Sequence, residues 1–184
     1  RKKKRYILKF FILVAVATGM YFFLNSSFFD IQKVTVENNN LYTAEQIISI
    51  ASAKTGENLF EASLSKMKDK LLADPYIKNV KLKRKIPAEV VIIVEERIEY
   101  AAVPYGNSFI IIDNKGMVLR KSAEEPALTL LVGMTIKNMK PGTPLEVEAN
   151  TGLTDTLKLL QEVKRHELYF KKIDISKVFV KAYI

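Results

Sequence analysis

The chain of 184 residues has no cysteine and a single histidine, His166. Without cysteine no disulfide can form, so a domain outside the cytoplasm must be held together by its apolar core. One histidine and no thiol leave little from which to build a nucleophilic triad or most zinc sites, and neither G-x-S-x-G nor H-E-x-x-H occurs. Only seven glycines are present, without a phosphate-cradling loop. We therefore expect no catalytic, metal-binding or cofactor-binding residues, and a non-enzymatic protein that binds other proteins.

The few polar residues that remain as catalytic candidates have simpler explanations. His166 follows Lys164 and Arg165 near the end of a predicted helix, where a surface or capping role is expected. Glu95 and Glu96 are adjacent in a predicted strand, so their side chains point to opposite faces and cannot act as an acid/base pair.

The first 24 residues combine a basic tail with a long apolar stretch. Residues 6–24 cover about 28 Å as a helix if Lys9 turns its amine back to the headgroups, close to the ~30 Å hydrocarbon core. Lysine and arginine beside a span stay on the cytoplasmic side, which puts the N-terminus in the cytoplasm and the rest outside. The residues that give this topology signal are Arg1, Lys2, Lys3, Lys4, Arg5 and Lys9. A cleaved signal peptide is the alternative, but the Phe28-Phe29 pair after the apolar stretch suits an interfacial aromatic belt better.

The formal net charge of +9 mostly reports this tail. Six of the 29 lysines and arginines lie in residues 1–9, which leaves 23 basic against 20 acidic residues in the remainder. The one dense basic stretch outside the tail alternates with apolar residues and is expected to be a solvated strand face, so nucleic acid is not an expected partner. That stretch comprises Lys78, Lys81, Lys83, Arg84 and Lys85.

The first exterior segment reads as strand, helix, helix, strand, strand. Residues 31–37 alternate as a strand, and Thr43 with Gln46 predicts a capping box at the start of a helix. A second helix is predicted around Leu64, Met67 and Leu71, and strands over 76–84 and 88–96 are close enough to form an antiparallel hairpin. Since such short helices cannot bury their apolar faces alone, we expect both on one face of a three-stranded sheet, an α+β arrangement.

That order, directly after a single signal-anchor, resembles the POTRA domain of the FtsQ/DivIB bacterial cell-division proteins, here over residues 28–97. One residue departs from the family pattern, because Glu99 stands where the family commonly has a proline. The matching positions are Phe29, Ile31, Val34 to Val36, Gly56, Asn58, Leu59, Phe60, Pro75, Ile77, Val80, Pro87, Val90 to Val94, Glu96, Arg97 and Ala101.

Residues 98–184 are expected to form a second, β-rich domain of the FtsQ/DivIB type with one helix. An Asp-x-x-Gly turn at Asp113 and Gly116 between apolar strands predicts a hairpin, with the aspartate accepting turn amides and the glycine at positive φ. Further strands are predicted at 128–132, 173–175 and 178–184, and a helix from near Thr154. The chain lacks an initiator methionine and stops within an apolar alternating stretch, so we expect truncation of both the 1–5 tail and this domain.

Sheet edges are the expected binding device, because an edge strand can pair with a strand from a partner. In the first domain the candidates are 31–37 or 76–84. In the second domain the candidates are Val178, Phe179, Val180, Lys181 and Tyr183. The resemblance implies as partners two single-span coiled-coil proteins, FtsB/DivIC-like and FtsL-like, bound near the C-terminal strands, and the septal peptidoglycan synthase complex. It also implies a place in the cell membrane at the division septum.

Other partners and functions stay open at this stage. The basic tail can attract anionic membrane lipid, and the small residues Ala15, Ala17, Thr18 and Gly19 would permit close helix packing within the membrane. A POTRA-containing envelope transport or assembly module is one alternative, although no internal repeat or barrel pattern is present. A membrane-anchored fragment of an envelope enzyme is another.

Overall fold

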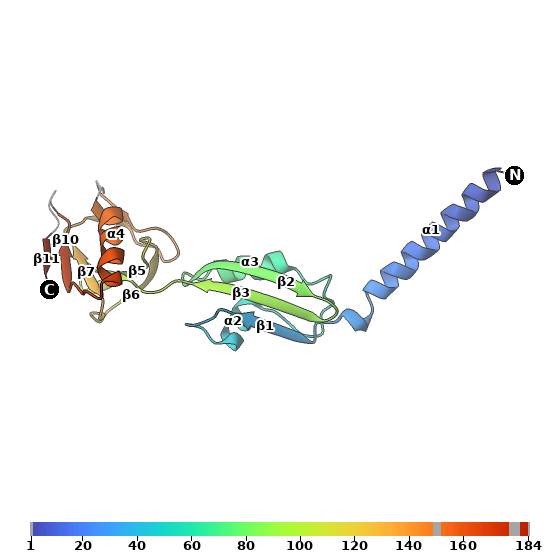
Figure 1. Ribbon diagram of the computed structural model, residues 1–184, viewed down its shortest axis with the longest axis horizontal. Coiled ribbons are helices and arrows are strands. Elements are labelled where there is room, and N and C mark those ends of the chain that lie inside the picture. Colours follow the sequence, from blue (N-terminus) through green and yellow to red (C-terminus); the bar gives the residue numbers. More distant parts are fainter. Residues whose placement is uncertain (1, 149–151, 177–180, 184) are drawn as a thin grey trace. The chain divides into compact units, whose positions relative to one another are not determined.

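The computed structural model describes residues 2–148, 152–176 and 181–183. The chain divides into two compact units. The first unit contains the chain up to Leu71 together with Asn79–Glu95, and the second contains Leu72–Lys78 and the chain from Glu96 onward (Figure 1). The α+β class, with an N-terminal apolar helix and two β-containing units, is as predicted.

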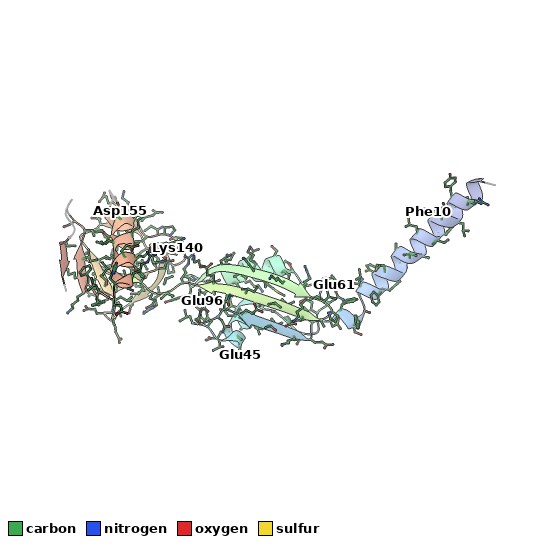
Figure 2. The ribbon with its side chains drawn as sticks, viewed as in Figure 1. Phe10, Glu45, Glu61, Glu96, Lys140 and Asp155 are labelled. Atoms are coloured by element: carbon green, nitrogen blue, oxygen red, sulfur yellow. The ribbon has the colours of Figure 1, made fainter. Side chains whose placement is uncertain are left out.

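The N-terminal helix α1 spans Lys2–Leu24, so it includes basic residues that the predicted span, 6–24, left out. Lysine and arginine are good helix formers, so nothing in the tail ends the helix. Arg5–Leu24 has a mean hydropathy of 2.2, and none of it is buried against the rest of the chain. Phe10, for example, projects from the helix without a covering element (Figure 2). By length and composition α1 can cross a membrane.

The first unit contains a three-stranded sheet built from β1 Lys33–Glu37, β2 Ile77–Lys85 and β3 Glu89–Glu96. Its strand order is β1-β3-β2, and β1 runs parallel to β3 with Lys33 opposite Glu89. Because β3 lies between them, both β1 and β2 are outer strands. A short 3-10 helix, η1 Ser27–Phe29, leads from α1 into the sheet.

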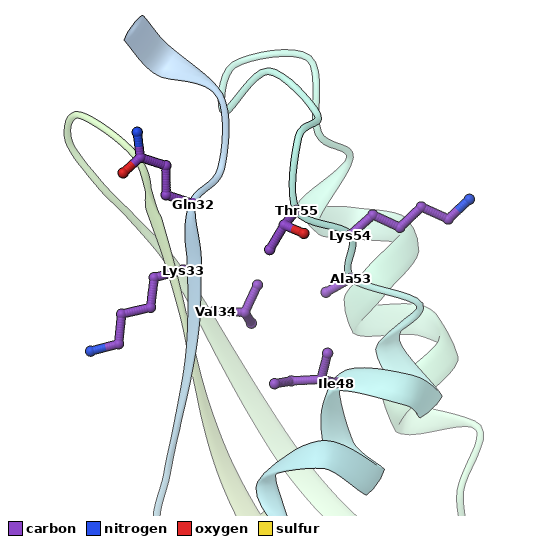
Figure 3. A pocket seen from close by; sticks show the side chains of 7 residues that line it. All are labelled: Gln32, Lys33, Val34, Ile48, Ala53, Lys54 and Thr55. Atoms are coloured by element: carbon purple, nitrogen blue, oxygen red, sulfur yellow. The ribbon is translucent and has the colours of Figure 1, made fainter. Parts of the chain in front are cut away.

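Two short helices, α2 Ala44–Ala51 and α3 Leu64–Leu72, lie on one side of this sheet (Figure 3). The capping box predicted for α2 is present, with the Gln46 amide donating to Thr43 Oγ1 over 3.3 Å and the Thr43 amide donating to Gln46 Oε1 over 2.8 Å. The helices bury their apolar stripes against the central strand, as their spacing predicts. The residues buried in this core include Ile47, Ala51, Met67, Leu71, Val90, Ile92 and Val94.

The second unit contains a six-stranded sheet with the order β11-β10-β7-β4-β5-β6. Its strands are β4 Ala101–Tyr105, β5 Ser108–Ile112, β6 Val118–Ser122, β7 Thr129–Val132, β10 Lys172–Asp174 and β11 Lys181–Tyr183. Helix α4 Gly152–Arg165 packs on the sheet through Leu153, Leu157 and Leu160, which share a core with Val103, Ile110, Ile112, Leu131 and Ile173. The small pair β8 Ile136–Asn138 and β9 Glu146–Val147 stands beside it.

The Asp-x-x-Gly hairpin forms as predicted. Asp113 Oδ1 accepts hydrogen bonds from the amides of Lys115 and Met117, both 2.8 Å, and Gly116 has φ of 80°. Arg97 Nη1 donates to Asp113 Oδ2 over 2.7 Å, a contact that the sequence did not indicate. The aspartate side chain is only 2% exposed and the arginine 14%. The turn is therefore held by a nearly dry ion pair as well as by its own amides.

Several elements differ from the sequence-based expectations. Strand β4 was not predicted, because its alanines have weak strand propensity and Pro104 lies inside it. The proline is tolerated because β4 pairs with β7 only at Ala101 and Ala102, so beyond them β4 has β5 alone beside it. Helix α4 is already formed at Gly152, two residues before the predicted start. The strand predicted over 178–184 is observed as Lys181–Tyr183, while residues 178–180 and 184 lie outside the described chain.

Candidate partner-binding edges

The two outer strands of the small sheet are the ones that the sequence offered as edges. They differ in how well they could accept another strand. Strand β2 carries lysines along its length, and charged side chains, lysine above all, disfavour pairing between edge strands. The amide of Val80 in β2 also donates to the side chain of Asn79, 2.9 Å away, which occupies one of its backbone donors.

Strand β1 has a hollow beside it. The hollow has a volume of about 600 Å³ and is lined by Gln32, Lys33, Val34, Ile48, Ala53, Lys54 and Thr55. In Figure 3 the side chains of Val34, Ile48 and Ala53 point toward one another, while Lys33 and Lys54 point away. A strand added to β1 could place an apolar side chain here. Sequence reasoning missed the hollow because its walls come from a strand and from the end of a separate helix.

At the far end of the chain, β11 is the outermost strand of the six-stranded sheet. Of the predicted partner-binding residues, Lys181 and Tyr183 lie in β11, and Val178, Phe179 and Val180 lie outside the described residues. Within the described chain β11 has one neighbouring strand, β10, with which it pairs in antiparallel register. Its second side is therefore an edge of the described sheet.

The direction of the β11 backbone groups follows from the hydrogen bonds of β10. The carbonyl of Lys171 accepts from Leu130 and the amide of Ile175 donates to Val132, so the odd-numbered residues of β10 direct their backbone groups to β7. Successive residues of a strand alternate, so Lys172 and Asp174 face β11. Their partners there are Tyr183 and Lys181, which leaves the backbone N–H and C=O of Ala182 directed away from β10, toward the edge.

The opposite edge of this sheet, β6, is partly covered by the chain itself. Val118 donates to the carbonyl of Thr143 over 3.0 Å and accepts from the amide of Gly142 over 2.8 Å. Gly116 accepts from the amide of Leu145 over 2.8 Å. These contacts use backbone groups that a partner strand would need. Over the described residues, β6 is therefore the end of the sheet that is less available to a partner strand.

A charged cluster in the second unit ties the turn just before β2 to β6. Glu99 accepts hydrogen bonds from Arg120 Nε, 2.6 Å, and from the Tyr76 hydroxyl, 2.7 Å. Hydrogen bonding from Arg120 lowers the pKa of Glu99, and the same contact raises the pKa of Arg120. Burial, followed by the bond to Glu99, raises the pKa of Tyr76 to about 12. The residue that departs from the family pattern thus has a structural role, because it anchors the side chain of Tyr76, just before β2, and that of Arg120 in β6.

The remaining candidates are placed as follows. Arg5 and Lys9 are exposed on α1, Lys2 to Lys4 are in its first turn, and Arg1 lies outside the described residues. In the basic stretch of β2, Arg84 is not simply solvated, because its guanidinium donates to the carbonyls of Leu59 and Ala62. His166 is exposed just after α4. Over the described residues, no three acidic or histidine side chains gather in a group that could hold a metal ion.

Comparison with known proteins identifies the first unit. Residues 29–97 match the family model described as "POTRA domain, FtsQ-type". The cell division protein DivIB of Clostridium acetobutylicum is 33% identical over 162 residues, which cover 84% of this chain and 63% of that protein. DivIB of Clostridium tetani is 28% identical over 141 residues, covering 76% of this chain and 52% of the relative.

The similarity also extends to proteins with the other family name. Cell division protein FtsQ of Syntrophotalea carbinolica is 32% identical over 92 residues, which cover 50% of this chain and 32% of that protein. The chain spans between half and two thirds of the length of the two DivIB relatives. The chain therefore carries an FtsQ-type POTRA domain behind an apolar helix, and it is similar to the DivIB cell-division proteins along most of its length.

Proposed function

We propose that this protein is a non-enzymatic, single-pass scaffold of the bacterial division apparatus. Helix α1 anchors it in the cell membrane with the N-terminus in the cytoplasm, and both β-containing units stand on the outer side at the septum. There it binds FtsB/DivIC-like and FtsL-like single-span coiled-coil proteins and helps to recruit or regulate the septal peptidoglycan synthase complex. Similarity to DivIB supports the division role, and the exposed tail residues Arg5 and Lys9 support the orientation.

The observation that carries the binding part of this proposal is the open side of β11. Ala182 directs one backbone donor and one acceptor outward, and the opposite edge of the same sheet is partly occupied. A partner segment in extended conformation would continue the sheet there, with backbone hydrogen bonds giving affinity. The predicted residues Val178, Phe179, Val180, Lys181 and Tyr183 remain the proposed contact segment.

Co-purification tests the identity of the partners. The tagged full-length protein is isolated from its native membrane, and the proteins that accompany it are identified by mass spectrometry. Small single-span coiled-coil proteins and a septal synthase are expected. Recovery of an outer-membrane barrel, or of lipid alone, would instead favour a transport or assembly module or an unrelated anchor.

A proline at position 182 tests the edge. Ala182→Pro removes the outward N–H and leaves the groups that bond β10, so the sheet should persist while partner capture weakens. One lost backbone hydrogen bond is worth about 0.5–1.5 kcal/mol, or roughly two- to twelvefold in affinity, before any clash of the ring with an added strand. The matched control, Ala182→Val, keeps the N–H and should bind as the parent does. Equal binding by a folded Ala182→Pro variant would exclude this edge.

A further inference from the structure

The end of the first unit that adjoins α1 carries a chain of four aromatic rings. Phe23, in the last turn of α1, has its ring centroid 6.2 Å from that of Phe28 and 5.2 Å from that of Phe29. Phe29 in turn contacts Phe60, 5.1 Å away, from the loop after α2. Phe29 is buried, but Phe28 is 58% exposed and Phe60 is 41% exposed. The rings therefore extend an apolar surface from the helix onto the folded domain.

Hydrogen bonds fasten the same loop to the end of α1. Asn58 is buried, and its Nδ2 donates to the carbonyl of Leu24, 2.8 Å away, in the last turn of the helix. Its Oδ1 accepts from the amide of Phe60, 2.9 Å, and Leu59 donates to the carbonyl of Phe29, 2.8 Å. A terminal helix carbonyl that would otherwise need water is thus satisfied by the domain. The backbone of Phe60 is thus held next to the C-terminal end of α1.

The β2–β3 turn lies at the same end of this unit. Arg84, near the end of β2, donates through Nε to the carbonyl of Leu59, 2.7 Å, and through Nη2 to that of Ala62, 2.8 Å. The turn that follows presents Ile86, which is 66% exposed. An isoleucine that is exposed at a turn adds no buried apolar area to the folded unit. Its side chain is therefore available for contact with something outside the unit.

We propose that Phe28, Phe60 and Ile86 form a membrane-contacting surface that rests in the interfacial zone of the bilayer. The apolar span ends at Leu24, so Phe23 lies at the boundary of the hydrocarbon. The rings of Phe28 and Phe29 contact Phe23, and the ring of Phe60 contacts Phe29, so these rings lie near that boundary. Ile86 follows Arg84, which is bonded to the loop that carries Phe60, so it lies at the same end of the unit. Aromatic rings are favoured at this depth, where water gives way to acyl chains. The surface is continuous with the span itself, so its occupant is lipid.

The basic residues near this surface are already engaged within the protein, so the proposed contact with lipid is apolar rather than electrostatic. Lys85 is paired with Glu89 at 3.0 Å, and Arg84 is engaged with backbone carbonyls. Glu61 lies beside Phe60 in the loop near α1 (Figure 2). The acidic residues Asp30, Glu57 and Glu61 are close in sequence to Phe28 and Phe60. Anionic lipid should therefore matter little.

Site-specific spin labels test this proposal, since the chain has no cysteine of its own. Four single-cysteine variants of the full chain are labelled with a nitroxide and reconstituted into phosphatidylcholine nanodiscs. Ile86→Cys and Phe60→Cys report on the surface. Leu41→Cys is the matched control, because Leu41 has an exposed fraction between those of Phe60 and Ile86 and lies beyond the other end of β1, roughly 17 Å along the strand. Val14→Cys reports on the centre of the span.

The measurement is the accessibility of each label to oxygen, which concentrates in lipid, relative to a water-soluble nickel chelate. We expect a several-fold higher ratio at 60 and 86 than at 41, the highest ratio at 14, and no change when phosphatidylglycerol is added. Aqueous values at 60 and 86 with a deep label at 14 would overturn the surface contact while leaving the anchor intact. An aqueous label at 14 would overturn the anchor itself. A contrast that needs anionic lipid, or that arises only in native membranes with other proteins present, would overturn apolar lipid contact.

Discussion

Replacing Asp113 by alanine should destabilise the second unit more than a change at almost any other acidic residue. The buried carboxylate accepts from two turn amides and from Arg97, and all three donors would lose their partner. Removal of one member of a buried ion pair costs about 3–5 kcal/mol. The cost is lower where water can reach the unpaired arginine. It is higher by about 1 kcal/mol or more for each of the two turn amides that lose their acceptor. We expect a net loss of about 3–5 kcal/mol.

Hydrogen exchange followed by mass spectrometry of the full chain measures this loss locally. A loss of 3 kcal/mol corresponds to roughly 100-fold faster exchange in peptides from β5 and β6 if exchange follows unfolding equilibria, since about 1.4 kcal/mol is a factor of ten. Peptides from β3, in the other unit, are an internal reference. Asp113→Asn keeps an acceptor for the turn amides but loses the charge. Its exchange rate in β5 and β6 should therefore lie between those of the parent and of the alanine variant.

The matched control is Asp155→Ala. Asp155 is exposed on α4 (Figure 2), where it makes a 3.4 Å surface pair with Lys158. Surface pairs of this kind contribute at most about 1 kcal/mol, so exchange in β5 and β6 should hardly change. If Asp113→Ala and Asp155→Ala behaved alike, the turn would not be held by the buried pair and the argument from its geometry would fail.

Two further changes test other parts of the second unit. The hydrogen bond from Arg120 lowers the pKa of Glu99 below its ordinary value of 4.5 in the folded state, so the carboxylate contributes stability above pH 4.5 that is lost as the pH falls through the folded-state pKa. The difference in melting temperature between the parent and Glu99→Gln should therefore shrink between about pH 7 and about pH 3, and a constant difference would contradict this role. Gly133→Ala should cost about 2 kcal/mol or more, because φ is +87° and a Cβ would lie 2.6 Å from the backbone nitrogen of Ser176. Gly106→Ala, with φ of +57° and nothing within 4 Å, is its control and should show only the roughly 1–2 kcal/mol cost of the left-handed conformation in the same thermal unfolding assay.

Features that depend on near neighbours in the sequence could be predicted, and features that join distant segments could not. The capping box of Thr43 and Gln46 and the turn at Asp113 and Gly116 each involve residues within four positions, so their chemistry is visible in the sequence. The ion pair of Arg97 with Asp113 bridges 16 residues and carries no local signal. The same applies to the hollow beside β1.

The candidate edges show the same contrast between local features, which could be predicted, and long-range pairing, which could not. Alternating apolar residues indicated that 31–37 and 76–84 are strands, but only the sheet order shows that both are outer strands, with β3 between them. The sequence also drew attention to the far C-terminal stretch. That Ala182 is the residue directing its backbone groups to the edge follows only from the register with β10. Pairing register depends on contacts across the sheet, which a single sequence does not display.

The parallel pairing of β1 with β3 has a consequence for synthesis of the chain. Lys33 is opposite Glu89, so the first strand leaves the ribosome 56 residues before its only partner in the described sheet. Synthesis proceeds at roughly 5–20 residues per second, so about 3 to 11 seconds pass before β1 can form hydrogen bonds with β3. Throughout that interval the valines of β1 have no partner strand beside them. The first unit can close only when the β2–β3 hairpin arrives, so its folding is a single late event rather than a stepwise one.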